Sequence, residues 1–223
     1  MALSLLELRS VSRIYGQGVA QVSALSDVSL RVEAGEFVAV TGPSGSGKTT
    51  LLNILGLLDR PDRGDYLLQG ESTGELSEVE RARLRGSSLG FIFQAFNLIP
   101  ERSALENVEL GLRYRDLPKR ARTAAARAAL NRVGLEARLD HLPRELSGGE
   151  QQRTAIARAI VGGRSLLLCD EPTGNLDSET AHEVLKLLVS LNQAGATVVL
   201  VTHNLAMAGY AHRMVSLADG SVA

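Results

Sequence analysis

One stretch of the sequence constrains the fold more than any other. An apolar run over 37–41 stops at a glycine-rich loop, and a helical apolar pattern begins just beyond it. Residues 42–49 fit G-x-x-x-x-G-K-[ST], whose glycines let successive backbone N–H groups form a nest for phosphate. The following helix aims the positive end of its dipole at the same point. We therefore expect a bound nucleotide to contact Gly42, Pro43, Ser44, Gly45, Ser46, Gly47, Lys48, Thr49 and Thr50.

Two residues of this loop have distinct expected roles. The Lys48 ammonium group would reach the β- and γ-phosphates, and the Thr49 hydroxyl would help to hold Mg²⁺. A plain Gly/Ser turn between a strand and a helix is the alternative interpretation. The order of strand, loop and helix favours nucleotide binding.

Composition narrows the class of protein. The chain has 223 residues, a formal net charge of −1 and one cysteine, Cys169. The nearly balanced charge gives no electrostatic case for nucleic acid or an anionic membrane, and a single cysteine fits a reducing compartment. No apolar segment approaches the roughly 20 residues that span a bilayer, and residues 1–7 lack the basic start of a signal peptide. We expect a soluble, cytoplasmic protein.

The hydrophobic pattern alternates between strands and helices. Antiparallel strands are expected where apolar and polar residues alternate, over 4–14 and 25–33. Further strands are expected over 37–41, 66–69, 89–94, 165–170, 197–202 and 214–217. Helices are expected over 50–58, 77–85 (charged and at the surface), 103–113, 119–133 and 151–161. Near-continuous apolar strands separated by helices indicate an α/β fold with a parallel sheet buried on both faces.

Two segments contain side chains of types that bind ligands in other proteins, so each has a ligand-binding interpretation and a structural one. Tyr15 lies in the loop 15–18 between the first two strands, where its ring could stack on adenine or simply occupy a turn. The basic side chains of 119–132 fit the solvated side of an amphipathic helix, because no aromatic residues lie between them. No nucleic-acid partner is expected.

Polar residues follow the predicted parallel strands at their carboxyl ends. Gln94, Asp170, Glu171 and His203 each come just after a strand, as the phosphate loop does. Ligands of parallel sheets bind at this edge, so these side chains would converge on the γ-phosphate and its metal ion. Asp170 suits the Mg²⁺ site and Glu171 suits the attacking water. A plain turn at 170–172 and a structural role for His203 are the alternatives.

A second helix start has features of an anion site. Ser147 and Glu150 form the capping-box pattern S-x-x-E, which by itself explains a stable helix start. The intervening Gly148 and Gly149 disfavour a helix, but they suit close approach of phosphates to the backbone. One ATP held between two copies, by loop 42–49 of one and 147–149 of the other, accounts for both starts. The expected dimer is symmetric and holds two nucleotides.

These motifs, in this order, make the whole chain resemble the ATP-binding-cassette (ABC) family. Residues 42–49 resemble its Walker A loop, and 146–150 its LSGGQ signature, with Glu150 in place of the commoner glutamine. Residues 166–170 resemble Walker B, followed by Glu171 at the catalytic position. The remaining matches are Tyr15 to the A-loop, Gln94 to the Q-loop, 175–177 (with Asp177) to the D-loop and His203 to the switch histidine.

The resemblance implies an organisation and partners. It implies one domain over 1–223, in which 1–94 and 165–223 form a RecA-like P-loop NTPase core with an antiparallel β-subdomain, and about 95–164 form a helical signature subdomain. ATP and Mg²⁺ would be the cofactors, Gln94 and His203 would act with Glu171, and Gln94 would also contact the metal. ATP closes a homodimer in this family, and a groove near the Q-loop grips separate transmembrane permease subunits on the cytoplasmic side.

Residues 90–100, 104–108 and 172–177 narrow the resemblance to one branch, with ATPases for lipoprotein release, macrolide export and cell-division signalling. Asn204 departs from it, because Asp usually follows the switch histidine there. The alternative is a soluble ABC ATPase that acts on DNA or the translation machinery, which would bring a coiled-coil insertion or tandem cassettes. A phosphate-loop kinase for small molecules has no use for the glycine pair at 148–149.

Overall fold

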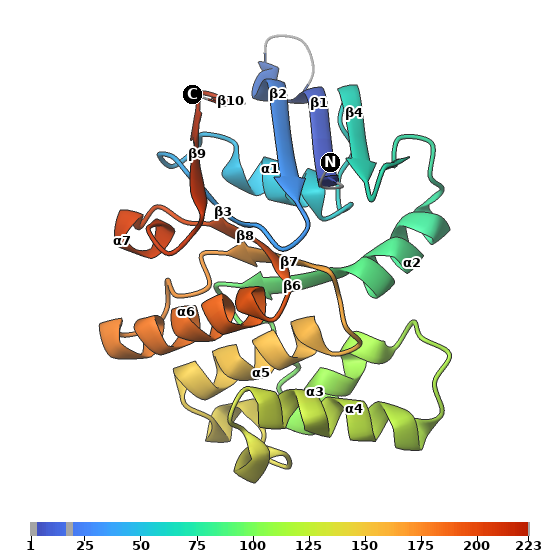
Figure 1. Ribbon diagram of the computed structural model, residues 1–223, viewed down its shortest axis with the longest axis vertical. Coiled ribbons are helices and arrows are strands. Elements are labelled where there is room, and N and C mark those ends of the chain that lie inside the picture. Colours follow the sequence, from blue (N-terminus) through green and yellow to red (C-terminus); the bar gives the residue numbers. More distant parts are fainter. Residues whose placement is uncertain (1–3, 17–19, 223) are drawn as a thin grey trace.

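Two β-sheets and a group of helices make up the fold shown in Figure 1. The computed structural model describes residues 4–16 and 20–222. The first sheet is antiparallel, with the order β2-β1-β4-β5, and consists of β1 (Ser4–Tyr15), β2 (Val22–Glu33), β4 (Arg63–Leu68) and β5 (Glu71–Ser72). The predicted antiparallel pairing of the first two strands is confirmed.

The second sheet has the order β10-β9-β3-β8-β7-β6 and is parallel except at β10. Its strands are β3 (Phe37–Thr41), β6 (Leu89–Phe93), β7 (Leu166–Asp170), β8 (Thr197–Val201), β9 (Arg213–Ala218) and β10 (Ser221–Val222). The predicted α/β fold with a parallel sheet is confirmed, with the strands within a few residues of their expected ends.

Helices cover both faces of the parallel sheet. The α-helices of the described residues are α1 (Lys48–Leu55), α2 (Glu78–Ser88), α3 (Ala104–Glu109), α4 (Lys119–Arg132), α5 (Gly148–Ile160), α6 (Ser178–Gln193) and α7 (Leu205–Ala208). Figure 1 shows α1 between the two sheets, α5 and α6 on the other face of the parallel sheet, and α3 and α4 beyond α5.

The parallel strands alternate their side chains between two separate cores. In β7, Leu166 and Leu168 pack with α1 and the antiparallel sheet, whereas Leu167 and Cys169 pack with the helices on the opposite face. All four side chains are fully buried. Burial on both faces explains why this strand lacks the apolar–polar alternation of a half-exposed strand.

Helix α1 ends earlier than the pattern predicts, at Leu55 rather than at residue 58. Leu57 has a φ of 56°, which a continuing helix does not permit. Its carbonyl accepts hydrogen bonds from Arg81 and Arg85 of α2 at 2.9 and 2.6 Å. Helix α2 was expected at the surface, yet Arg81 is only 2% exposed, because its guanidinium group stabilises the carboxyl end of α1.

Other differences concern helix ends and two helices that were not predicted, α6 and the short α7. Helix α3 ends at Glu109 and continues as a 3₁₀ turn over Leu110–Leu112, and α5 begins at Gly148 rather than at residue 151. Helix α6 was not assigned, although Asp177 caps it and its buried residues follow the spacing i, i+3, i+4, i+7. Two predictions fall partly outside the described residues. They concern the loop 15–18, of which 17 and 18 are not described, and the segment 1–7, for which no signal peptide was expected and of which 1–3 are not described.

Candidate nucleotide-binding and hydrolytic site

A large cavity lies at the carboxyl ends of the central parallel strands. Its volume is about 710 Å³. The residues that line it come from the start of β2, the phosphate loop, α1, and the ends of β7 and β8: Val22, Ser23, Ala24, Ser44, Gly45, Gly47, Lys48, Thr49, Thr50, Asp170, Glu171, Val201 and His203. Six of the nine predicted loop residues, both carboxylates and the imidazole therefore share one cavity, whereas Gly42, Pro43 and Ser46 do not line it.

The phosphate loop presents unpaired backbone donors to this cavity. Gly47 has a φ of 100°, and a Cβ there would overlap the carbonyl oxygen of Ala24, so only glycine fits. Gly47 also precedes α1 without a side-chain cap, and the first turn of α1 contains no acidic residue. The N–H groups of Lys48, Thr49 and Thr50 lack helical carbonyl partners by geometry. The combination favours an anion.

The Lys48 side chain folds back over its own loop. Its Nζ donates to the carbonyl oxygens of Gly42 and Pro43 at 2.8 and 2.7 Å. The loop is held further by the backbone N–H of Gly220, which donates to the Ser46 carbonyl at 3.1 Å. The Ser46 hydroxyl is buried and has no hydrogen-bond partner. The loop carries the positive charge of Lys48 and has hydrogen-bond donors without partners, and both features favour binding of an anionic ligand.

Asp170 ends β7 in a half-buried position. Burial raises its pKa above the ordinary value, the neighbouring Glu171 charge adds to this, and the Lys48 ammonium group partly opposes it. A cation beside this carboxylate would therefore be favoured. Asp170 and the Thr49 hydroxyl line the same cavity and offer oxygen atoms, which are the ligands that Mg²⁺ prefers. No group of three His, Cys, Asp or Glu residues in 4–16 and 20–222 forms a metal site of its own.

Glu171 is held by the segment that follows β8. Its Oε1 accepts the backbone N–H of His203 at 2.9 Å and lies 2.7 Å from His203 Nδ1, while Oε2 accepts the Thr202 hydroxyl at 3.1 Å. A carboxylate only accepts, so Nδ1 carries the proton and Nε2 is left free. The φ of Glu171 is 44°, an uncommon value for a non-glycine residue, and such values cluster at functional sites.

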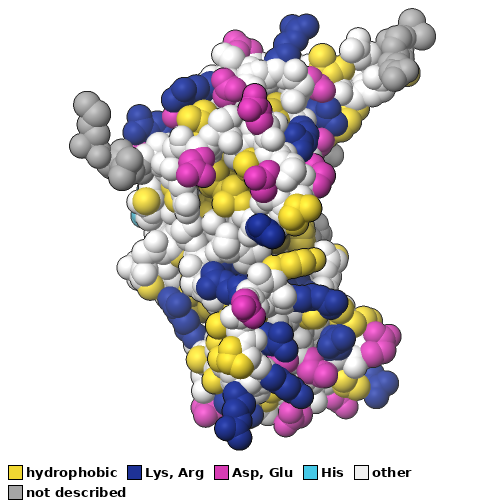
Figure 2. All heavy atoms as spheres, turned by 90° about the vertical axis from the view of Figure 1, so that its right-hand side faces the viewer, with side chains coloured by type: hydrophobic (Ala, Val, Ile, Leu, Met, Phe, Trp, Pro, Cys, Tyr) yellow, Lys and Arg dark blue, Asp and Glu magenta, His cyan; other side chains and the backbone are white. Residues whose placement is uncertain are grey.

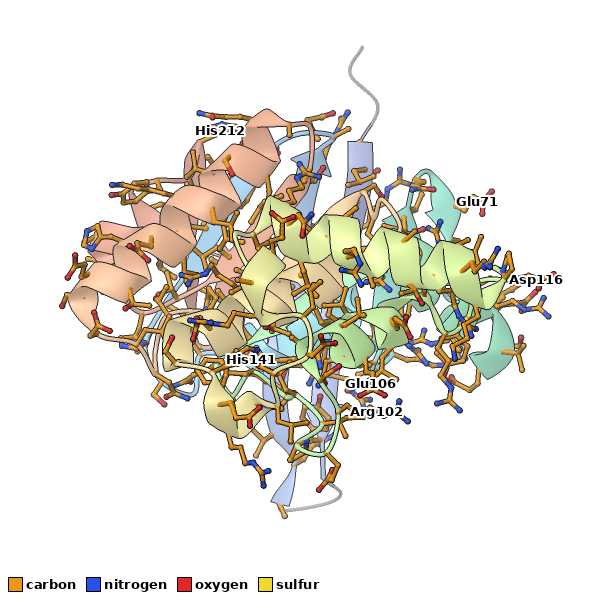
Figure 3. All side chains as sticks on the ribbon, turned by 90° about the horizontal axis from the view of Figure 1, so that it is seen from below. Glu71, Arg102, Glu106, Asp116, His141 and His212 are labelled. Atoms are coloured by element: carbon orange, nitrogen blue, oxygen red, sulfur yellow. The ribbon has the colours of Figure 1, made fainter. Side chains whose placement is uncertain are left out.

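His203 stands apart from the other histidines. Of the four in the sequence, all within the described ranges, it alone lines the cavity. Figure 3 shows His212 at the upper left edge of the molecule and His141 apart from it, near the middle of the view. His182 Nδ1 lies 2.7 Å from the Ser178 carbonyl of its own helix. Asn204, in place of the usual aspartate, caps α7 by accepting the N–H groups of Ala206 and Met207. The amide therefore supplies the capping oxygen at that position.

Gln94 does not line the cavity. It follows β6, the third strand from β3, and strands about 4.8 Å apart put it roughly 14 Å along the sheet from the phosphate loop. Its side chain donates to Asn175 Oδ1 at 3.0 Å, and Asn175 Nδ2 donates back to the Gln94 carbonyl at 3.0 Å. A direct role for Gln94 at the metal requires it to leave Asn175.

The second helix start lies outside the cavity of its own copy. The Ser147 hydroxyl accepts the N–H of Glu150, and the Glu150 carboxylate accepts the N–H of Ser147 at 2.8 Å, which completes the predicted capping box. Arg138 Nε also donates to Glu150 at 2.8 Å. Chiefly this bond, and then the bond from Ser147, lower the pKa of Glu150 to about 2. The residues of this start are Ser147, Gly148, Gly149 and Glu150.

The glycine pair has a packing role that the sequence pattern did not reveal. A Cβ on Gly149 would overlap the Thr180 methyl group of α6, so glycine lets the two helices approach each other. Thr180 is fixed in turn by its hydroxyl, which donates to Asp177 Oδ2 at 2.6 Å. Asp177 caps α6 and does not line the cavity. The start of α5 and the D-loop therefore form one continuous surface.

Tyr15 lies at the border of the cavity rather than in its wall. It pairs with Val22 across the antiparallel sheet, and Val22 lines the cavity. Its hydroxyl donates to Asp59 Oδ2 at 2.6 Å, and the Arg13 guanidinium lies 4.6 Å above its ring.

Gln152 is a residue of this region that the sequence pattern did not single out. It is fully buried, and its Nε2 donates to the carbonyl of Pro172 at 2.6 Å and to that of Phe93 at 3.4 Å. It thus connects α5 to the segments that follow β6 and β7. A polar residue on the buried face of an amphipathic helix is the signal that would have found it.

Comparisons with known proteins agree with this geometry. The ABC transporter family model matches residues 25–174. The macrolide export ATP-binding/permease protein MacB of Escherichia coli is 50% identical over 218 residues, which cover 98% of this chain and 34% of that protein. The chain thus spans about a third of the length of the first such relatives.

Two further relatives match the chain over nearly their whole length. An ABC transporter ATP-binding protein of Methanocaldococcus jannaschii, MJ1508, is 46% identical over 98% of this chain and 97% of its own length. The post-hydrolysis dimer of the ATP-binding cassette MJ0796, bound to ADP and Pi, has a TM-score of 0.88 at 43% identity and covers 97% of this chain and 96% of that one. The chain belongs to the ABC transporter family.

Proposed function

We propose that the chain binds ATP and Mg²⁺ and hydrolyses the ATP as one of two identical cassettes that drive separate membrane subunits. The observation that carries this proposal is the meeting of a phosphate loop, two carboxylates and an imidazole around one cavity of about 710 Å³. A soluble cassette acting on DNA or ribosomes is not favoured, because the relatives are named as transporter components.

The loop 42–50 would hold the triphosphate with backbone N–H groups. Lys48 would exchange the two loop carbonyls for the β- and γ-phosphates. Thr49 and Asp170 would hold Mg²⁺, the remaining ligands coming from phosphate, water and, after it leaves Asn175, Gln94. When bound, this ion supplies positive charge that offsets the charge on the transferring phosphoryl group.

Glu171 would act as the general base for the attacking water. The bonds from Thr202 and the His203 backbone fix its carboxylate without using all of its lone pairs. His203, oriented by the Nδ1 bond, would contact the γ-phosphate through Nε2. The two adjacent acids thereby take separate roles.

The second half of each site would come from a partner copy. Gly148 and Gly149 retain free first-turn N–H groups after the capping box has used those of Ser147 and Glu150. Ser147, Gly148, Gly149 and Glu150 would face the γ-phosphate bound by the other copy, with Asp177 beside them. The loop of one copy and the signature of the other then enclose each ATP.

The membrane partner would bind a groove between α2 and the helical subdomain, residues 95–164. The groove has a volume of about 500 Å³; its lining includes Phe91, Phe93, Tyr114, Arg85, Arg158 and Arg164. Figure 2 shows hydrophobic and Lys or Arg side chains together across the middle of this face. No acidic residue is among the described residues that line the groove, so a segment with apolar and acidic side chains would fit it.

The location of the chain follows from this partner. None of the helices in the described ranges is long and apolar enough to cross a bilayer. We place the cassette on the cytoplasmic face of the membrane, attached through its partner, in the branch that includes macrolide exporters.

Mixing two inactive variants tests the shared site. Lys48→Ala disables the loop, and Gly148→Asp places a negative charge at the signature. A mixed dimer contains one site with both halves intact, so the mixture should hydrolyse ATP faster than either variant alone, and the extra activity should grow with total concentration. Activity equal to the mean of the separate variants at every ratio and concentration would contradict the shared site.

A further inference from the structure

The ring of Tyr15 is backed by a guanidinium group on one face. Arg13 and Tyr15 lie two residues apart on β1, so their side chains leave the same face of the strand. The Arg13 Cζ atom is 4.6 Å from the ring centroid, within the range of a cation–π interaction. Tyr15 remains 37% exposed although one ring face is covered and the hydroxyl is bonded. More than a third of the residue is therefore open to a ligand, which leaves room for contact with the ring face opposite Arg13.

Two aspartates fix this pair in place. Arg13 donates from Nε to Asp59 Oδ2 at 2.9 Å and from Nη1 to Asp62 Oδ1 at 2.8 Å. The Tyr15 hydroxyl donates to the same Asp59 oxygen at 2.6 Å. Burial opposes the ionised form of Asp59, but the bonds from Tyr15, the Arg60 backbone and Arg13 outweigh it and hold its pKa below the ordinary value. The carboxylate is charged at neutral pH and restrains both side chains.

The same aspartate connects the ring to the phosphate site. The backbone N–H of Asp59 donates to the carbonyl of Asn53, which lies in α1, at 3.2 Å. The amino end of α1 forms the phosphate loop boundary, and Val22, the strand partner of Tyr15, lines the cavity. The open ring is thus held at a set position relative to the phosphates.

We propose that Arg13 is a positioning residue for the nucleobase. It backs one face of Tyr15 and keeps the ring ordered, so that the other face receives the purine of the nucleotide whose phosphates lie in loop 42–49. This inference rests on the proposed ATP site and adds one residue to it, because Arg13 acts on the base and has no effect on the phosphates. A purely structural role, tying β1 to the 59–62 turn, is the alternative.

The size of the effect follows from the ordering of one side chain. A ring that is already immobile spares the ligand the entropy of ordering it, which corresponds to about a 2- to 10-fold gain in affinity. The stacked base itself is worth more, about 5- to 100-fold.

Affinities for ATP and for inorganic tripolyphosphate separate the two roles, because tripolyphosphate has no base. Competition against a fluorescent ATP analogue gives both values for each variant. Arg13→Gln should weaken ATP about 2- to 10-fold and leave tripolyphosphate unchanged, with Arg13→Lys in between. Tyr15→Ala should weaken ATP more, and adding Arg13→Gln to it should cause no further loss. Arg9→Gln is the matched control, because Arg9 lies on the same strand, is paired with Glu7 and is largely exposed.

Each other outcome has a defined meaning. Equal losses for ATP and tripolyphosphate in Arg13→Gln, an ATP affinity no lower than that of Arg9→Gln, or full additivity with Tyr15→Ala would each overturn the positioning role. An unchanged ratio of ATP to tripolyphosphate affinity in Tyr15→Ala would instead remove Tyr15 from the proposed ATP site. If Arg13→Gln fails to fold, Arg13→Lys and Tyr15→Phe, which loses only the Asp59 bond, take its place in the same comparison.

Discussion

Adjacent acidic residues acquire different properties from their surroundings. Asp170 is half-buried near Lys48 and its pKa is raised, whereas Glu171 is bonded by Thr202 and His203. The environment changes between these two consecutive residues, because Asp170 is the last residue of β7 and Glu171 has a positive φ that ends the extended backbone. Position along the chain, more than residue type, separates the metal-binding role proposed for Asp170 from the hydrolytic role proposed for Glu171.

Glu171→Gln should retain ATP binding and lose hydrolysis. The amide keeps the size of the side chain but cannot take a proton from water, so turnover should fall roughly 10²- to 10⁴-fold. ATP should then hold the two copies together, which size-exclusion chromatography with and without ATP would detect. Hydrolysis at the wild-type rate would show that another group is the base.

Asn175→Ala should make Gln94 easier to recruit. The reciprocal bonds between the two side chains and the Gln94 backbone must break before Gln94 can approach a metal ion. A net hydrogen bond is worth about 0.5–1.5 kcal/mol, so the Mg²⁺ concentration for half-maximal ATPase activity should fall roughly 2- to 10-fold. Asn131→Ala, on the exposed face of α4, is the control. No shift, or the same shift when Gln94 is also alanine, would refute the exchange.

At the scale of the elements, the close contact of α5 with α6 depends on Gly149, which has no side chain. Gly149→Ala should destabilise the protein by about 1–3 kcal/mol, because its Cβ overlaps the Thr180 methyl group. Adding Thr180→Ser removes that methyl, keeps the hydroxyl for Asp177 and should restore most of the loss. Gly148→Ala, whose Cβ would lie 3.3 Å from Leu176, should cost less. Melting temperatures of the four proteins test this, and the absence of rescue by serine would contradict it.

The negative charge of Glu150 at the start of α5 should make the free energy of unfolding depend on pH in the acidic range. The folded pKa of Glu150 is about 2, below the unfolded value of about 4.3, so its contribution is full above roughly pH 5 and disappears as the pH falls toward 2. Glutamine can still form the capping box, so Glu150→Gln isolates the charge. We expect a loss of about 1 kcal/mol at pH 7, after allowing for solvent screening at Arg138.

Urea unfolding at pH 7, 4 and 3 measures this contribution. The difference between wild type and Glu150→Gln should shrink at each step, while Glu136→Gln, an exposed site nearby, should show no such trend. A difference that stays constant with pH would assign the stabilisation to something other than the Arg138–Glu150 pair.

The strands were easier to predict than the helix ends. Both faces of β7 and β8 are buried, so their apolar runs were unambiguous. The early end of α1 depends on Leu57, whose left-handed conformation is stabilised by arginines from α2, and no local pattern contains that contact. Similarly, Glu171 and His203 were found at strand ends, but their mutual bonds and the pairing of Gln94 with Asn175 required the strand order.

At the scale of the whole molecule, we expect the groove between α2 and the helical subdomain to bind the membrane partner and to have no part in ATP hydrolysis. Tyr114→Asp alters a side chain in its lining that is 74% exposed. We expect unchanged ATPase activity of the isolated chain and loss of co-purification with the proposed membrane partner. Val79→Asp, an exposed apolar site on α2 outside the groove lining, is the control and should retain the partner. Equal retention by both variants would place the partner elsewhere.

Helix α1 lies between the cavity at the phosphate loop and the groove proposed for the membrane partner. Its amino end lines the cavity proposed for the nucleotide. Just beyond its carboxyl end, the Leu57 carbonyl accepts hydrogen bonds from Arg81 and from Arg85, which also lines the groove. A helix resists compression along its axis, so we expect a shift at one end of α1 to displace the other end. Linkage makes this transmission two-way, and tension exerted by a membrane partner would alter how firmly the nucleotide is retained.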